Sequence, residues 1–132
     1  MRIILDESAP QKLRLLIDSR HVVVTTWFQG WSGLKNGALL AAAEEAGFDL
    51  FITADQEISY QQNLTGRRIA LLVLSTNNWG VVKEQVKLIA DAIESATAGT
   101  YVFVDIGHGR GQVPCRARRF AGAIGKTASQ VD

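Results

Sequence analysis

Carboxylate side chains follow three short apolar stretches of the chain, each of which ends at or just before an aspartate. The acidic residues concerned are Asp6 with Glu7, Asp55 with Glu57, and Asp105. Carboxylates gathered at one place repel one another unless a cation lies among them, and Mg²⁺ and Mn²⁺ prefer oxygen ligands. Such an ion can activate water and stabilise charge that develops on a phosphate. One interpretation of the pattern is therefore a metal-dependent phosphodiesterase site. The other, which the spacing alone favours, is that these acids are ordinary loop residues that face water.

Several polar and aromatic residues could bind a substrate beside such a site. Lys35 could contact a phosphate, and Trp27 and Trp31 could stack on the bases of a single strand. Gln61 could hydrogen-bond a substrate. Each has a structural alternative, because loop lysines are commonly solvated, loop tryptophans commonly pack, and a glutamine can simply stabilise a turn.

Other catalytic chemistries find little support in the sequence. The chain has one cysteine, Cys115, for which no base partner is indicated, so nucleophilic catalysis is not supported and an internal disulfide is excluded. His21 and His108 belong to no histidine and cysteine cluster, so a zinc site is not expected. Residues 125–127 resemble the end of a phosphate-binding loop, but the first glycine of that motif is missing and no strand precedes it.

The elements that would position the acids alternate between strands and helices. Apolar or β-branched stretches predict strands at residues 3–5, 21–25, 49–53, 69–74 and 101–104. Helical spacing predicts helices at about residues 10–19, 37–46 and 81–96, with Ser8 as the cap of the first and Gly47 ending the second. This order predicts an α/β fold, a three-layer α/β/α sandwich with a mainly parallel five-stranded sheet. Ligands bind such sheets beyond the carboxyl ends of the strands, which is where the acids fall.

Charge is unevenly distributed along the 132 residues. Residues 1–106 carry nine basic and twelve acidic residues, whereas residues 107–132 carry five basic and one acidic. We therefore expect one domain at residues 1–106 and a basic extension with glycine and arginine at residues 107–132, flexible or loosely packed. Its arginines could add sequence-independent attraction to RNA, or simply be solvated.

The sequence predicts a cytoplasmic protein. Its longest strictly apolar run is six residues, 69–74, far short of the roughly 20 that a membrane helix needs, so no membrane partner is expected. The first acid, Asp6, comes too early for a signal peptide. A single cysteine also fits a reducing compartment.

Four ordered blocks of the sequence resemble small bacterial PIN-like proteins. The blocks are residues 3–10 (Ile-Ile-Leu-Asp-Glu-Ser-Ala-Pro), 30–37, 53–57 (Thr-Ala-Asp-Gln-Glu) and 60–64, and the resemblance covers about residues 1–105. These proteins are related to the wider PIN nucleases, which include the ribonuclease toxins of bacterial toxin–antitoxin pairs. The resemblance implies an α/β/α fold and cleavage of single-stranded RNA that depends on Mg²⁺ or Mn²⁺. It also implies an antitoxin protein or a second copy of the chain as candidate partners.

Two aspartates match the metal-binding acids of that family. Asp6 falls at the end of the first strand, and Asp55 follows a threonine and one further residue at the end of a later strand. Glu57 falls where many relatives have another acid, which would be an outer or weaker ligand. Glu7 would point away from Asp6 on a strand, but at a strand end it could swing inward and bind the metal.

The sequence departs from the family pattern at two places. Asn36 stands where the wider PIN nucleases often have an aspartate that opens a helix, so the charge is missing although the amide oxygen can still bind a metal. The acid that they place on an intervening helix has no clear match. Glu44 and Glu45 lie at the far end of a helix and are expected to be solvated.

Two functions follow as competing hypotheses. In the first, the protein is a ribonuclease, with Asp6 and Asp55 holding the metal, Glu7 and Glu57 assisting, and Asn36 orienting water or completing the metal site. In the second, it is a degenerate module that binds RNA or a protein partner without cleavage. A phosphate-transfer regulator of receiver type ranks lower, because no lysine follows Asp105 until Lys126.

Overall fold

The structure, a computed structural model, describes residues 1–17, 20–26, 28–31, 33–34, 36–55, 67–106 and 116–121. For Asn36 and for residues 116–121 it describes the backbone alone. Four of the candidate residues lie outside these ranges: Trp27, Lys35, Glu57 and Gln61.

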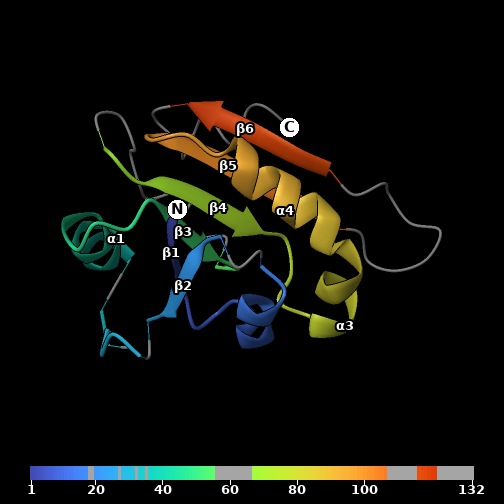
Figure 1. The fold of residues 1–132 in the computed structure, drawn as a ribbon, viewed down its shortest axis with the longest axis horizontal. Coiled ribbons are helices and arrows are strands. Elements are labelled where there is room, and N and C mark those ends of the chain that lie inside the picture. Colours follow the sequence, from blue (N-terminus) through green and yellow to red (C-terminus); the bar gives the residue numbers. More distant parts are fainter. Residues whose placement is uncertain are drawn as a thin grey trace.

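A six-stranded sheet forms the centre of the molecule (Figure 1). Its strands are β1 (Arg2–Leu5), β2 (Val22–Thr25), β3 (Leu50–Thr53), β4 (Ala70–Leu74), β5 (Thr100–Asp105) and β6 (Arg116–Ala121). They lie side by side in the order β2-β1-β3-β4-β5-β6. The first five are parallel to one another, and β6 is antiparallel to β5. The five predicted strands are therefore confirmed, to within one residue at each end.

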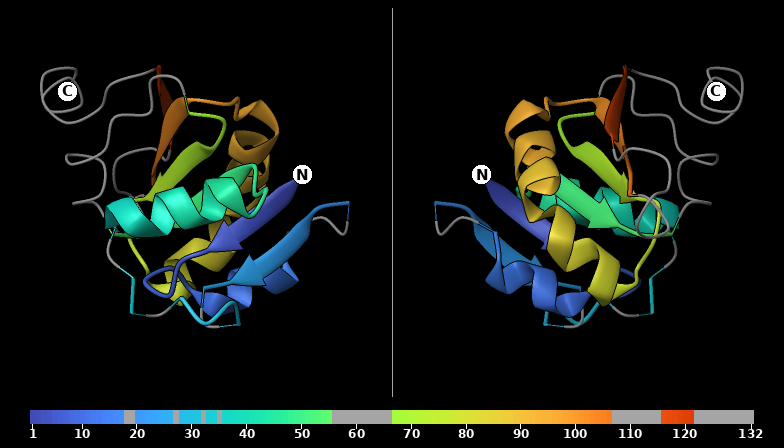
Figure 2. Two further views of the ribbon diagram at one scale, coloured as in Figure 1. Left: turned by 90° about the vertical axis from the view of Figure 1, so that its left-hand side faces the viewer. Right: turned by 90° about the vertical axis from the view of Figure 1, so that its right-hand side faces the viewer.

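Helices cover both faces of the sheet, which makes the fold a three-layer α/β/α sandwich. On one face, Ile3, Leu5 and Leu50 pack with Leu13 and Ile89, which come from the helical segments η1 (Gln11–Leu15) and α4 (Val86–Ser95). On the other face, the alternate strand residues pack with Leu39, Leu40 and Ala43 of α1 (Asn36–Glu45). Figure 2 shows α1 in front of the sheet in its left-hand view, and η1 and α4 in its right-hand view. The predicted fold class is confirmed.

Burial on two faces explains why the inner strands are continuous apolar runs. Successive residues of a strand point to opposite faces, so a strand covered on both sides is apolar at nearly every position. All five residues of β4 and all four of β3 are buried, and Thr53 at the end of β3 is the one polar residue among these nine. β2 differs, because it lies at the edge of the sheet and none of its four residues is fully buried.

The segment after β1 differs from the predicted helix. Instead of a helix at about 10–19, the chain forms a single 3₁₀ segment, η1, whose only buried residue is Leu13. Leu15 and Leu16 are 66% and 42% exposed. The prediction that Ser8 caps this helix is wrong, because Pro10 occupies the cap position and makes no side-chain bond.

The helix predicted at about 81–96 begins earlier and is divided. α3 (Trp79–Val82) leads through a 3₁₀ turn, η2 (Lys83–Gln85), into α4. Asn78 caps α3, since its side-chain oxygen accepts a hydrogen bond from the Gly80 N–H at 2.9 Å. Val82, Ile89 and Ile93 are buried on the apolar face that the spacing predicted.

Two further findings concern the ends of elements. α1 ends at Glu45, and Gly47 follows with φ +87°, the left-handed conformation expected for a glycine that ends a helix. β6 lies within the segment in which the sequence predicted no strand, and it pairs with β5 over six residues.

Within the described ranges, no helix has both the length and the apolar character needed to cross a membrane.

Candidate functional site

Asp6 and Asp55 lie at the same edge of the sheet, at the carboxyl ends of two neighbouring strands. β1 and β3 pair directly, with Leu5 opposite Ile52, and the Asp6 N–H donates to the Ile52 carbonyl at 2.8 Å. Asp6 is the first residue after β1, and Asp55 is the second after β3. Both side chains are partly exposed. The topology therefore brings together two acids that are 49 positions apart in the sequence.

The carboxylate of Asp6 is held by two hydroxyl groups. The Ser8 hydroxyl donates to Asp6 Oδ2 at 2.6 Å, and the Thr53 hydroxyl donates to the same oxygen at 2.8 Å. Hydrogen bonds to a carboxylate are among the stronger ones in proteins because the acceptor is charged. Both of these hydrogen bonds are made to Oδ2, and none is made by Asp6 Oδ1 to a residue that the structure describes.

Both hydroxyl groups also accept hydrogen bonds from the backbone. Ser8 Oγ accepts the Ala54 N–H at 3.1 Å, and Thr53 Oγ1 accepts the Asp55 N–H at 3.0 Å. Each hydroxyl carries a single hydrogen and lies within donating distance of Asp6 Oδ2. The two hydroxyls are also within hydrogen-bond distance of each other, at 2.9 Å, and either of them can donate in that contact.

Thr53 connects the two aspartates. Its hydroxyl accepts from the Asp55 backbone at 3.0 Å and donates to Asp6 Oδ2 at 2.8 Å, so the Asp55 nitrogen lies within about 6 Å of that carboxylate oxygen. Thr53 is fully buried. Among the described residues, Thr26 is the only other polar residue that is buried. The position of Asp6 relative to the start of the Asp55 loop is thus fixed by a buried group.

The turn after Asp6 is also fixed by hydrogen bonds. The Asp6 carbonyl accepts the Ala9 N–H at 3.0 Å and the Gln11 side-chain amide at 3.1 Å. The same amide donates to the Ala9 carbonyl at 2.9 Å. Gln11 therefore ties the beginning of η1 to the end of β1, which keeps Ser8 beside Asp6.

The other strand-end acids lie apart from this pair. Glu7 is exposed and lines a hollow beside β2, together with Gln11 and Arg14. Asp105 ends β5, which β4 separates from β3. At the end of β4 stands Ser75, whose hydroxyl donates to the Ile106 carbonyl and accepts the Ile106 N–H. Within the described residues, no group of three or more histidine, cysteine, aspartate or glutamate side chains could hold a metal ion.

The remaining candidate residues are described unevenly. α1 begins at Asn36, but nothing is described of the Asn36 side chain. The Trp31 ring is half-buried and meets Phe48 edge to face, with the ring centres 6.1 Å apart. The stacking of Trp31 on a base stays a prediction, as do the roles of Lys35, Glu57 and Gln61.

Glu44 differs from the expectation that it is simply solvated. Its side chain is 17% exposed and accepts a hydrogen bond from Arg67 at 3.1 Å. The Arg68 backbone N–H also donates to it, and this bond, followed by the charges of Arg67 and Arg68, holds the pKa of Glu44 below its ordinary value. Glu44 thus joins the end of α1 to the beginning of β4, while Glu45 is exposed as expected.

Sequence reasoning did not identify Ser8 and Thr53 as parts of the site. Ser8 was assigned to the cap of a helix, and Thr53 to the end of a strand. A signal was present, because a serine two residues after one candidate acid and a threonine two residues before the other are spaced to reach them at a shared edge.

Comparison with protein-family models, with curated proteins and with solved structures found no match.

Proposed function

We propose that the protein is a ribonuclease that cleaves single-stranded RNA with the help of Mg²⁺ or Mn²⁺, and that Asp6 and Asp55 bind the metal. The observation that carries this proposal is the pairing of β1 with β3, which sets both aspartates at one edge of the sheet with Thr53 between them. The resemblance of the surrounding sequence blocks to PIN-like proteins supports the choice of RNA as the substrate.

The donor groups present fit such an ion. Mg²⁺ and Mn²⁺ bind carboxylate oxygens and keep several water ligands, so two protein carboxylates can suffice. Asp6 Oδ2 is occupied by the hydroxyls of Ser8 and Thr53, whereas Oδ1 has no partner among the described residues. The two hydroxyls therefore fix the orientation of the carboxylate and leave one oxygen for a ligand.

Each residue then has a distinct part in the reaction. When bound, a divalent ion would supply an activated water and would stabilise charge on the phosphate. Asp6 and Asp55 would hold the ion and so place the phosphodiester at the edge of the sheet. Ser8 and Thr53 would act as positioning residues, because they hold Asp6 and touch no substrate. Glu57 and Asn36 would complete the site, as the sequence predicts.

Cleavage assays on paired variants test this function. Asp6→Asn and Asp55→Asn remove a metal-binding charge with little change of shape, and the rate of cleavage of a single-stranded RNA in Mn²⁺ should fall at least about 100-fold. Asp91→Asn is the matched control, because Asp91 is exposed on α4 and lies on a different element from the site. EDTA should abolish cleavage by the wild type.

Two results would contradict the proposal. Cleavage by both variants at the wild-type rate would show that the site is assigned wrongly. Stoichiometric Mn²⁺ and RNA binding by the wild type, without cleavage across a range of single-stranded substrates, would instead identify a binding module.

A further inference from the structure

The edge strand β2 has hydrogen-bonding groups that the described structure leaves unused. The N–H groups of Val22 and Thr26 donate to the carbonyls of Met1 and Leu5, so alternate residues of β2 face β1. In a parallel pair, the residues between them direct their N–H and carbonyl groups to the other side. No strand among the described residues pairs with that side of β2. The Val23 N–H and carbonyl and the Thr25 N–H therefore point outward, while the Thr25 carbonyl on the same side accepts the Gln29 N–H at 3.1 Å.

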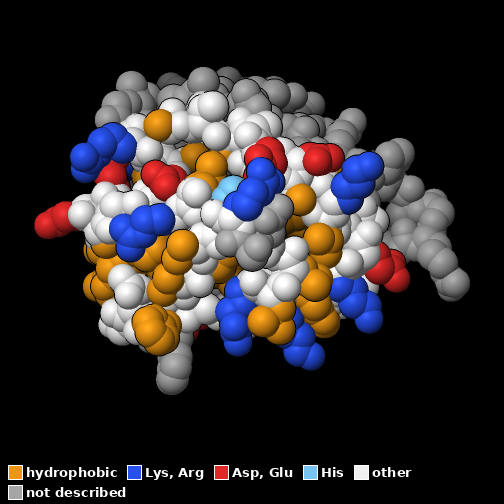
Figure 3. Space-filling model, viewed as in Figure 1, with side chains coloured by type: hydrophobic (Ala, Val, Ile, Leu, Met, Phe, Trp, Pro, Cys, Tyr) orange, Lys and Arg blue, Asp and Glu red, His pale blue; other side chains and the backbone are white. Residues whose placement is uncertain are grey.

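This edge has only one of the features that usually keep an exposed edge from pairing. Natural proteins protect edge strands by making them very short, or with charged residues, proline or bulges. β2 is short, with four residues, but it reads Val-Val-Val-Thr and carries no charge and no proline. Val22 is 55% exposed, and Phe28, just beyond the strand, is 75% exposed. Figure 3 has the same view as Figure 1. Over β2 and η1 it shows hydrophobic side chains at the surface, with basic side chains between them.

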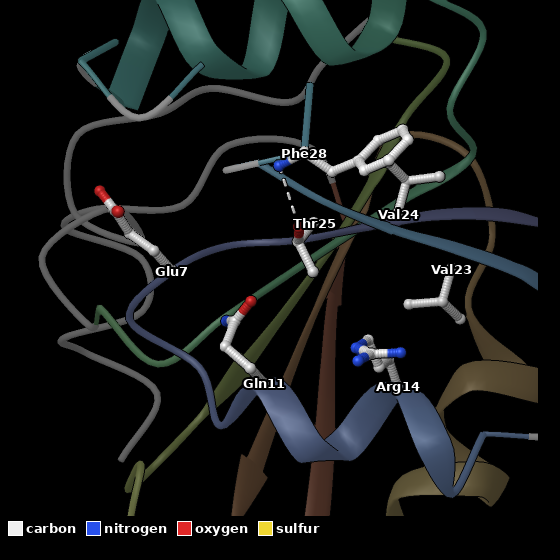
Figure 4. A pocket seen from close by; sticks show the side chains of 7 residues that line it. All are labelled: Glu7, Gln11, Arg14, Val23, Val24, Thr25 and Phe28. Atoms are coloured by element: carbon white, nitrogen blue, oxygen red, sulfur yellow. Dashed lines mark hydrogen bonds between the residues drawn. The ribbon is translucent and has the colours of Figure 1, made fainter. Parts of the chain in front are cut away.

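A hollow of about 700 Å³ runs along the same edge (Figure 4). Its lining includes Val23, Val24 and Thr25, which are consecutive residues of β2. Because consecutive strand residues point to opposite faces of a sheet, a hollow lined by all three must lie at the edge of the strand. The hollow is therefore open to a further strand.

Two unpaired charges lie at different positions along the hollow. Figure 4 shows Arg14 beside Val23, and Gln11 beside Thr25 with Glu7 beyond it. Glu7 and Arg14 both line the hollow and are both exposed. Neither forms an ion pair with a residue in the described part of the chain. The hollow thus has a basic end and an acidic end along the direction of β2.

We propose that this edge binds a second copy of the chain, with the two β2 strands antiparallel about a two-fold axis that passes beside Val24. Val24 would face its own copy, and Val23 would face Thr25 of the other copy. In this register the Thr25 N–H of each copy would donate to the Val23 carbonyl of the other. The Val23 N–H would donate to the second lone pair of the Thr25 carbonyl, which also accepts the Gln29 N–H. The two sheets would join into one continuous sheet across the dimer.

Charge complementarity is the reason to choose a second copy over an unrelated extended peptide. A two-fold axis across β2 reverses the direction of the strand, so the basic end of one hollow meets the acidic end of the other. Arg14 of each copy would then face Gln11 and Glu7 of the other. On the face covered by α1, the exposed apolar groups of Val22 and Phe28 would gather around the axis. This inference does not depend on the proposed function.

Charge reversal tests the register directly. The measurement is made in EDTA, so that no metal is involved. Glu7→Arg and Arg14→Glu should each raise the dissociation constant of the dimer at least about tenfold. Each variant would set like charges against each other at positions 7 and 14, and the two-fold axis repeats this repulsion on its other side. The double variant, with both substitutions, should restore the wild-type value. Lys87→Glu on the exposed part of α4 is the matched control and should leave the constant unchanged. Analytical ultracentrifugation gives the constants, and circular dichroism checks that each variant is folded.

Several outcomes would overturn the proposal. A wild type that stays monomeric at millimolar concentration has no such interface. A dimer whose constant is unaffected by either single variant, or is not restored in the double variant, is formed by another surface. Binding of an extended apolar peptide by a monomeric wild type would identify the edge as a peptide site instead.

Discussion

Replacing Thr53 by valine would test whether a buried hydroxyl holds the two acids in place. Valine keeps the shape of threonine, so the substitution opens no cavity in the core. It removes the hydrogen bond to Asp6 at 2.8 Å and the acceptor of the Asp55 N–H at 3.0 Å. The change therefore isolates the polar contribution of this one side chain.

The expected cost follows from these two bonds. A hydrogen bond to a charged group contributes about 1.5–3 kcal/mol to stability, and leaving a backbone N–H unpaired costs about 1–3 kcal/mol where it is buried. Asp55 is only partly buried, so water can partly replace the lost acceptor. We therefore expect Thr53→Val to lower the free energy of unfolding by about 2–4 kcal/mol. Urea denaturation measures this quantity.

Thr26→Val is the matched control for this measurement. Thr26 is 1% exposed and directly follows β2, but its hydroxyl has no hydrogen-bond partner among the described residues. Its removal should leave stability unchanged or raise it, because an unpaired buried hydroxyl is unfavourable. Equal stability of Thr53→Val and the wild type, or an equal loss in both variants, would refute the role given to Thr53.

Two further predictions concern the ends of the helical segments. Glu44→Gln should destabilise the protein by about 1 kcal/mol at neutral pH, as expected for loss of a charged hydrogen-bond acceptor. Because the folded protein holds the pKa of Glu44 below 4.5, its contribution is present above that pH and is lost as the pH falls through the lowered pKa. Urea titrations of both proteins at several pH values would measure this, and a difference that persists unchanged in strong acid would contradict it. Leu13→Ala should cost about 2–5 kcal/mol, since Leu13 is the one buried residue of η1, whereas Leu15→Ala should change stability by less than about 0.5 kcal/mol. Similar losses in both would show that η1 packs differently.

The sheet could be predicted from the sequence because its inner strands are covered on both faces. Residues 3–5, 50–52 and 70–74 are unbroken apolar runs, and such runs are typical of parallel strands between two layers of helices. The carboxyl ends of these strands share one edge whatever the strand order. Asp6 and Asp55 could therefore be assigned to the same edge without knowledge of the topology.

Other features could not be predicted because they depend on contacts between distant residues or on an edge position. Ser8 and Thr53 are 45 positions apart, and only the pairing of β1 with β3 makes them neighbours. The segment 116–121 reads Arg-Ala-Arg-Arg-Phe-Ala, which has no continuous apolar run, yet an edge strand needs none. The spacing of Leu13, Leu16 and Ile17 predicted a longer helix, but within η1 only Leu13 is buried, and beyond it Leu16 is exposed while Ile17 packs against the core.

The central claim is that Asp6 and Asp55 share one divalent cation, and a crystal soaked in Mn²⁺ tests it most directly. We expect a single anomalous peak at the edge of the sheet, at about 2.1 Å from a carboxylate oxygen of each aspartate. In Asp6→Asn crystals grown and soaked in the same way, that peak should weaken or vanish. A wild-type crystal with no peak there, or with an ion bound to one aspartate and out of reach of the other, would contradict the account.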